Sequence, residues 1–268
     1  MYGAVVIVPA FQTLFFSLFR YRSFVSRRFS GLSNYLLLFQ DRVFGLSLWH
    51  NLYWSFLTIV IPLSVGLVLA VLVTKSRGRL VLGAIYFLPV TVPLVVGGVV
   101  WKWIYNPVFG LINLVMKRIG WTGLALNWLA DTDIAFYSLF VTGTWSYFGF
   151  CVLIFTNALQ SIDENLYEAA RIDGANEFQL FFYVTVPSLR TTINFLIIWS
   201  TIGAMKFFDL VYVMTKGGPG HSTEIVGTYI FELAFRQQRV GYASSAAMVL
   251  MMIILVLTYA IIRTRERE

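Results

Sequence analysis

The sequence predicts an all-α integral membrane protein with six transmembrane helices, on the evidence of its composition and of the spacing of its charges. Of its 268 residues, 58% are hydrophobic and 12% are charged, and the mean hydropathy is +0.75. An ordinary soluble domain has about 45–50% apolar and about 25% charged residues. Because this chain has half the usual charge, it has too little polar surface to cover a soluble fold, and a soluble protein is excluded.

Long charge-free stretches locate the predicted helices, because a charged side chain is costly in hydrocarbon. Five such stretches are Met1–Phe19, Val43–Thr74, Leu80–Trp101, Ile134–Ile162 and Val240–Ile262, and a sixth, Thr191–Thr215, is interrupted only by Lys206 and Asp209. The first stretch lacks a basic start and a small-residue cleavage site, which favours a retained helix over a signal peptide. Continuous apolar runs favour helices over a barrel. We therefore predict one transmembrane domain over 1–268, with spans near 1–19, 50–74, 80–101, 134–160, 192–215 and 240–262 and a loop at 161–190.

The Lys and Arg residues do not fix the orientation of these helices. If both termini are cytoplasmic, eight of the twenty cations lie inside, which leaves twelve outside, five of them from Arg20 to Arg42. This excess is opposite to the usual bias toward positive cytoplasmic loops. The net charge of +7 is spread along the chain without a block of cations, which argues against a nucleic-acid partner.

Acidic residues concentrate in the loop between the predicted fourth and fifth helices. Five of the thirteen acids fall within fifteen positions: Asp163, Glu164, Glu168, Asp173 and Glu177. Ser161 followed by Glu164 fits a capping box, which predicts the start of a short helix.

One face of that short helix combines small and acidic residues. Leu166, Ala169, Ala170 and Asp173 recur at helical spacing. Gly174 permits a turn with positive φ, and a second helix is predicted over Glu177–Val184, with Pro187 as its stop. The segment is either a docking surface outside the bilayer or a solvated loop.

The same segment carries a family resemblance. Glu168-Ala169-Ala170-Arg171-Ile172-Asp173-Gly174-Ala175, followed by Val186-Pro187, resembles the EAA loop of binding-protein-dependent ABC importer permeases. Further segments similar to the carbohydrate-uptake branch, of maltose and glycerol-phosphate type, are Gly31–Tyr35, Trp103–Asn106, Phe109–Asn113, Asn127–Leu129, Phe208–Asp209, Thr215–Pro219 and Gly241–Ala243. The resemblance implies the type I permease fold with a cytoplasmic EAA coupling loop, in a bacterial or archaeal inner membrane with cytoplasmic termini.

The resemblance also implies partners and a division of labour. It implies a second permease subunit, forming a heterodimer, two ATP-binding cassette ATPases, an external solute-binding protein and a carbohydrate-type solute, with membrane lipid around them. The chain has no Walker-type loop, so ATP and Mg²⁺ are expected in the ATPases, with no cofactor and no catalysis here. The residues expected to couple to the ATPase are Leu166, Glu168, Ala169, Ala170, Asp173 and Gly174: Glu168 makes a charged contact, the alanines seat the helix, and Gly174 sets the angle of the next helix.

The solute path is expected along the two helices that flank this loop. Ser146, Tyr147 and Phe150 are polar or aromatic residues of the fourth span, and Ser200, Gly203, Ala204 and Phe207 share one predicted stripe of the fifth. Sugars stack on rings and bond to scattered polar groups, although small residues at helical spacing also pack helices together in membranes. Lys206 and Asp209, at i and i+3, either pair with each other or serve the path.

Two other classes of protein remain as alternatives. A membrane-embedded transferase needs convergent acids or metal ligands, but the two histidines, His50 and His221, are far apart and Cys151 is the single cysteine. An ion-coupled secondary transporter could use Lys206 and Asp209, but inverted repeats are expected there and none is evident. The sequence does not identify the solute.

Overall fold

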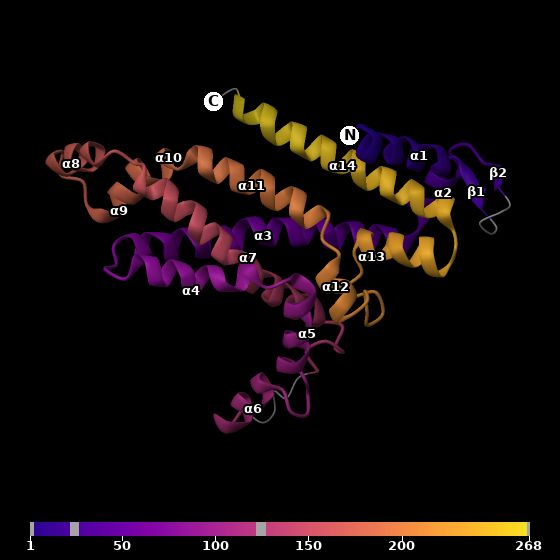
Figure 1. Ribbon diagram of the computed structural model, residues 1–268, viewed down its shortest axis with the longest axis horizontal. Coiled ribbons are helices and arrows are strands. Elements are labelled where there is room, and N and C mark those ends of the chain that lie inside the picture. Colours follow the sequence, from indigo (N-terminus) through magenta and orange to yellow (C-terminus); the bar gives the residue numbers. More distant parts are fainter. Residues whose placement is uncertain (1–2, 22–26, 122–126, 267–268) are drawn as a thin grey trace. The chain divides into compact units, whose positions relative to one another are not determined.

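The computed structural model describes residues 3–21, 27–121 and 127–266, and its backbone is almost entirely helical (Figure 1). The chain divides into two compact units. The first unit comprises the described residues of Met1–Trp54, Gly98–Phe140 and Ile202–Glu268, and the second comprises Ser55–Gly97 and Val141–Thr201. The predicted all-α class is therefore confirmed, with one small addition at the N-terminal end.

The elements run in the following order: η1 (Gly3–Ile7), α1 (Val8–Ser17), β1 (Phe19–Tyr21), β2 (Arg27–Phe29), α2 (Ser33–Gln40), α3 (Arg42–Thr74), α4 (Arg79–Thr91), α5 (Leu94–Ile104), α6 (Leu111–Arg118), α7 (Ala135–Gln160), α8 (Glu164–Ile172), α9 (Glu177–Leu180), η3 (Phe181–Thr185), α10 (Val186–Ser188), α11 (Arg190–Met205), α12 (Asp209–Met214), α13 (Val226–Phe231), η4 (Glu232–Arg236) and α14 (Val240–Glu266). The η elements are single π-helical turns. The strands β1 and β2 form a short antiparallel hairpin, which the apolar pattern did not predict.

Four helices of the described chain are long and apolar enough to cross a membrane. They are Arg42–Thr74, Ala135–Gln160, Arg190–Met214 and Val240–Arg263, and they overlap four of the predicted spans. A shorter apolar helix, Val5–Ser17, lies in the first predicted span, of which residues 1 and 2 are outside the described part. The bent pair α4 and α5 makes a fifth if it counts as one span, so the count of six stays a prediction.

The predicted span at 80–101 is not one continuous helix. Helices α4 and α5 meet at an angle of 94°. Val92, which directly precedes Pro93, is extended with ψ of 123°, as expected because a proline disfavours the helical conformation of the residue before it. The apolar composition of this segment is unbroken, so a search for charge-free runs cannot detect the bend.

The first unit has its core around α14. Helix α1 packs along α14, and a buried cluster joins α14 to α2, α3, α13 and η4. Buried members of that cluster are Leu38, Phe44, Val226, Tyr229, Leu233, Tyr242, Ala243 and Ala246. Gly241 is required where α14 begins, because a Cβ there would lie 1.8 Å from the carbonyl oxygen of Phe19.

The second unit packs α3 against α7 and the start of α11. Its buried cluster contains Leu63, Ala70, Cys151, Phe155, Leu189 and Leu196. A Cβ on Gly66 would come within 2.5 Å of the Cβ of Cys151. A glycine opposite a small residue thus brings the two helices close, which is the packing typical of membrane helices.

Candidate coupling loop and translocation path

Helix α8 starts at an aspartate cap. The carboxylate of Asp163 accepts a hydrogen bond of 3.0 Å from the N–H of Asn165. The predicted capping box at Ser161 and Glu164 is therefore wrong: the Ser161 hydroxyl donates backward to the carbonyl oxygen of Ala158 at 2.8 Å. Both residues are good caps by type, and Ser161 still belongs to the turn that ends α7.

The turn after α8 is a left-handed helix cap, as predicted at Gly174. Gly174 has φ of +85°, its N–H donates to the carbonyl of Arg171 at 3.0 Å, and the N–H of Ala175 donates to the carbonyl of Ala170 at 3.0 Å. These two bonds form the Schellman motif. A reciprocal capping box between Asn176 and Gln179 then starts α9, so the direction of both short helices is fixed by local hydrogen bonds.

We expect Gly174→Val to uncouple ATP hydrolysis from uptake. A β-branched residue at positive φ is strained by about 1–2 kcal/mol, and the strain is relieved by changing the turn and therefore the direction of α9. The measurement is the ratio of solute imported to ATP hydrolysed in the reconstituted complex. Gly120→Val is the matched control, because Gly120 also has positive φ, of +84°, but ends α6 instead; an unchanged ratio in Gly174→Val would contradict the role of the turn.

The predicted coupling residues lie on an accessible helix. Glu168, Ala169 and Asp173 are exposed, Ala170 is half-buried, and Leu166 is 51% exposed. The structure adds apolar residues that the sequence pattern did not single out: Ile172 is 86% exposed, and Phe178 and Tyr183 are also exposed. The sequence feature that could have identified these three residues is a large apolar or aromatic side chain in a loop rich in acidic residues. The loop thus presents acidic, small and large apolar groups together.

The opposite side of the loop is tied to the second unit. The hydroxyl groups of Tyr167 and Thr185 lie 2.9 Å apart. The Lys75 ammonium, just after α3, donates to Glu177 Oε2 at 3.2 Å, and Arg171 lies 3.7 Å from the other oxygen of that carboxylate. The hydrogen bond and charge of Lys75 hold the pKa of the Glu177 carboxyl below its usual range. These contacts border a cavity of about 730 Å³ between the loop and the ends of α3 and α7.

Pro187 does not stop the helix that precedes it, which corrects the predicted boundary. Helical backbone runs from α9 through η3 and α10 to α11, with a single turn residue at Leu189. Pro187 lies in α10, directly after the π-helical turn η3, and the chain stays helical on both sides of it. The coupling loop is consequently continuous with the helix that carries half of the predicted path.

The predicted path residues of α7 and the start of α11 meet within the second unit. The hydroxyls of Tyr147 and Ser200 are 2.8 Å apart. Phe150 lies beside Tyr147, with ring centroids 5.9 Å apart, and stacks on Trp199 at 6.0 Å. Ser146 is buried and donates to the carbonyl of Thr142 within its own helix. Tyrosine, serine and ring faces are therefore adjacent there, and Ser200 is buried, so a role of this group in the path stays a prediction.

The remaining path residues belong to the first unit, and they do not form the predicted stripe. Helix α11 ends at Met205, so Phe207 lies in a break, at residues 206–208, where helical spacing no longer applies. Ala204 is 4% exposed, whereas Gly203 is exposed and a Cβ on it would meet nothing within 4 Å. Gly203 therefore faces open space and Ala204 faces the packed interior.

The same break separates Lys206 from Asp209. Their predicted pairing depended on helical spacing, and it is not among the ion pairs that the described residues form. Both residues are exposed. Of the two alternatives for these residues, the pairing is therefore wrong, since the backbone between them is not helical, and the role in the path stays a prediction.

Asn51, which the sequence analysis did not single out, bonds to the backbone groups at this break. Its amide donates to the carbonyl oxygens of Ala204 at 3.1 Å and Met205 at 3.4 Å, and its oxygen accepts from the N–H of Val226 at 2.8 Å. The side chain is fully buried. A polar residue in an otherwise apolar run was the available signal, because such residues in membrane helices bond to other helices.

We expect Asn51→Leu to lower stability by at least about 2 kcal/mol, because a buried donor or acceptor left unpaired costs about 1–3 kcal/mol. Thermal unfolding of the purified chain in detergent measures this loss. The control is Ser47→Ala on the same helix, since the buried Ser47 hydroxyl bonds only to the Val43 carbonyl of its own helix. Equal effects of the two substitutions would remove the special role of Asn51.

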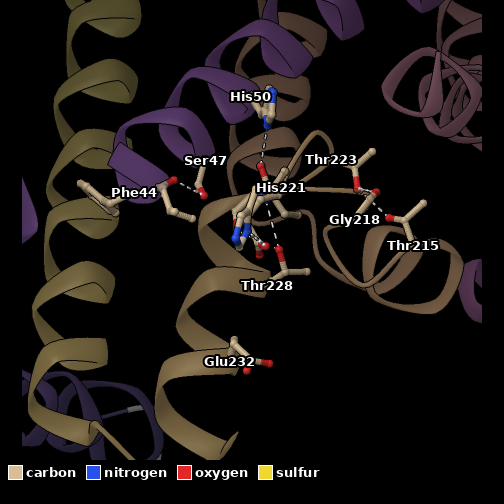
Figure 2. Close-up of polar contacts among 12 residues, drawn as sticks. Phe44, Ser47, His50, Thr215, Gly218, His221, Thr223, Thr228 and Glu232 are labelled. Carbon is tan, nitrogen blue, oxygen red and sulfur yellow. Dashed lines mark hydrogen bonds and ion pairs between the residues drawn. The ribbon is translucent and has the colours of Figure 1, made fainter. Parts of the chain in front are cut away.

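A hydrogen-bonded loop between α12 and α13 borders this region (Figure 2). The Nδ1–H of His50 donates to the carbonyl of Glu224 at 2.7 Å, and that of His221 donates to the Glu224 carboxylate at 3.0 Å. Thr215 and Thr223 join their hydroxyls at 2.7 Å. The Thr215–Pro219 segment thus belongs to a hydrogen-bonded loop, and both His50 of α3 and His221 of the loop bond to Glu224.

The long apolar helices define a class of protein, a multi-pass helical membrane protein. The family described as "Binding-protein-dependent transport system inner membrane component" matches residues 62–265, and the chain belongs to this family of ABC importer permeases. It is a transporter component and not a catalytic subunit.

Individual relatives cover nearly the whole chain. The chain is 35% identical over 257 residues to the "Probable ABC transporter permease protein YurN" of Bacillus subtilis (strain 168), covering 94% of this chain and 88% of that one. It is 34% identical over 260 residues to the "Trehalose/maltose transport system permease protein MalF" of Thermococcus litoralis, covering 96% and 86%. A solved bacterial ABC transporter "involved in the import of the acidic polysaccharide alginate" contains a similar fold, with a TM-score of 0.87 at 20% identity over 99% of this chain and 91% of that one.

Proposed function

We propose that this chain moves a sugar or a related polyol from an external binding protein into the cytoplasm, by alternating access driven by partner ATPases. The observation that carries the proposal is the exposed face of α8, held at a fixed angle by the Gly174 turn. A helix that only filled a loop would not need acidic, small and large apolar groups on its accessible side. Relatives named for trehalose and maltose and for sulfoquinovosyl glycerol support a carbohydrate solute.

In this proposal α8 seats on a cytoplasmic ATPase. Glu168 meets a cation of that subunit, Ala169 and Ala170 allow close approach, and Leu166 and Ile172 supply buried apolar area. ATP and Mg²⁺ are held by two ATPase subunits, and this chain needs no cofactor of its own. The other partners are a second permease subunit and the external binding protein.

The location and topology follow from the same assignment. With α8 in the cytoplasm, both termini are cytoplasmic and the chain lies in the inner membrane of a bacterial or archaeal cell. Asp41 and the loop between α12 and α13 then lie on the outer side. The solute passes residues such as Tyr147, Phe150 and Ser200, whose rings and hydroxyls are adjacent.

Reconstitution tests the proposal directly. The chain is placed in proteoliposomes with its partner permease and ATPases, and uptake of labelled mono-, di- and oligosaccharides and polyol phosphates is measured with and without ATP and binding protein. Uptake that needs both components is the expected result. Uptake driven by an ion gradient without ATP would instead establish a secondary transporter and overturn the proposal.

A further inference from the structure

A small cationic pocket lies in the first unit, lined by none of the residues assigned to the coupling loop or the path. It has a volume of about 230 Å³. Its lining residues are Arg20, Tyr21, Asn34, Leu37, Arg239 and Tyr242. Two arginines, distant in sequence, thus face one space, and neither has been given a role by the coupling loop or the path.

The backbone around the pocket is rigidly held. The buried amide of Asn34 donates to the carbonyl oxygens of Ser17 at 2.8 Å and Phe19 at 2.9 Å. Gly241 brings the start of α14 against the same Phe19 carbonyl. Arg20 directly follows Phe19, and Arg239 directly precedes α14. The backbone contacts at Phe19 and Gly241 therefore position both arginines at the pocket.

Asp41, which bonds to the pocket residue Tyr242, already has hydrogen-bond partners for its carboxylate. Asp41 accepts hydrogen bonds from the hydroxyls of Tyr229 at 2.7 Å and Tyr242 at 3.1 Å, and from the N–H of Val43 at 2.8 Å. Burial by itself raises the pKa of Asp41, but these hydrogen bonds hold it below the usual range. Its oxygens are therefore committed to tyrosines and to the start of α3.

The arginine charges have no acidic partner in the described part of the chain. The ion pairs formed there involve neither Arg20 nor Arg239. Arg239 lies over the ring of Tyr242, 4.4 Å from its centroid. Arg20 stands directly opposite Arg28 in the β1–β2 pair, and like charges at such positions repel. An anion in the pocket would relieve this repulsion and satisfy donors that now face solvent.

The surroundings indicate which anion. Helices α1 and α14 pack along each other (Figure 1) and carry exposed apolar side chains, including Phe11, Phe15, Leu255 and Val256. Only 17% of the most apolar stretch of α14 is buried inside the protein. Such surfaces suit acyl chains, and the pocket lies where α1 ends and α14 begins. A molecule with a charged head and apolar tails fits both parts.

We infer that the pocket binds the phosphate of an anionic phospholipid, whose acyl chains lie along α1 and α14. This gives a role to two of the cations that the proposed topology places outside, Arg20 and Arg239. Assignment to the outer leaflet rests on the topology under the proposed function, but the binding itself does not.

The test measures lipid binding by the purified full chain in detergent. Native mass spectrometry follows titration with dioleoyl-phosphatidylglycerol and, separately, with zwitterionic dioleoyl-phosphatidylcholine. We expect preferential retention of phosphatidylglycerol, and a loss of roughly 30-fold in its affinity when Arg20→Gln and Arg239→Gln are combined. The matched control is Arg236→Gln, because exposed Arg236 is already paired with Glu232 at 3.4 Å and its loss should leave lipid binding unchanged.

Further arms separate the other sources of negative charge. Inorganic phosphate that displaces the lipid at low millimolar concentration would assign the pocket to a free anion and overturn the proposal. A double variant that keeps phosphatidylglycerol but loses the external binding protein would assign the surface to that protein instead. If the double glutamine variant folds poorly, the single variants Arg20→Gln and Arg239→Gln are titrated instead, and unchanged phosphatidylglycerol affinity in both folded single variants overturns the proposal. Because no arm measures transport, its failure is distinguishable from failure of the proposed function.

Discussion

Glu168→Lys is expected to reduce ATP-dependent uptake to background while the chain still inserts and folds. Glu168 is exposed on α8, so its replacement does not disturb the packing of this chain. Breaking a charged pair in an interface costs about 2–5 kcal/mol, and reversal adds repulsion. The measurements are uptake in proteoliposomes and the amount of ATPase that copurifies, both of which should fall together.

The control for charge reversal is Asp133→Lys, an exposed acid that precedes α7. It changes the net charge by the same amount but leaves α8 intact, so uptake should stay near the wild-type level. Normal uptake by Glu168→Lys at wild-type expression would remove Glu168 from the coupling contact. An equal loss in both variants would show a general effect of charge.

Ala204→Trp is expected to lower the stability and the yield of folded protein, whereas Gly203→Trp should fold and block uptake. Ala204 is almost fully buried, and its carbonyl is held by Asn51. Adding a large ring to a packed site costs about 1–3 kcal/mol and often more. Gly203 has open space around it, so the same ring can be accommodated there, and on the proposed path it would obstruct the solute.

The two tryptophan variants are compared by yield of monodisperse protein, thermal unfolding in detergent, and uptake per folded molecule. The order of stability should be wild type, Gly203→Trp, then Ala204→Trp. A folded Gly203→Trp complex with wild-type uptake would exclude this face from the path. A stable Ala204→Trp chain would show that its surroundings are loosely packed.

The parts of the molecule that local rules govern could be predicted from the sequence. The positive φ at Gly174 and the two short helices around it depend on residues close in the chain, and the structure contains both. Where two local signals competed, the prediction failed: Asp163, not Ser161, caps α8. Pro187 likewise allowed either a stop or a first helical turn.

The parts that depend on distant contacts could not be predicted. The break after Met205 is compensated by Asn51, more than 150 positions away, and only the fold brings these groups together. Spacing along an assumed continuous helix therefore misplaced Phe207 and paired Lys206 with Asp209. The bend before Pro93 was not predicted for a related reason: hydropathy depends on the composition of a segment and not on the direction of its helix axis.

The coupling loop also has a mechanical consequence. It lies wholly within the second unit, and every boundary of that unit falls inside a helix: α3, α5, α7 and α11 each pass from one unit to the other. A force that a partner applies to α8 is therefore transmitted to the whole second unit. Movement of one unit relative to the other requires these four helices to bend, and the boundary in α5 falls at Gly97–Gly98. We expect spin-label distances within the second unit to stay constant through the ATP cycle and those across a boundary to change; constant distances everywhere would rule out this lever.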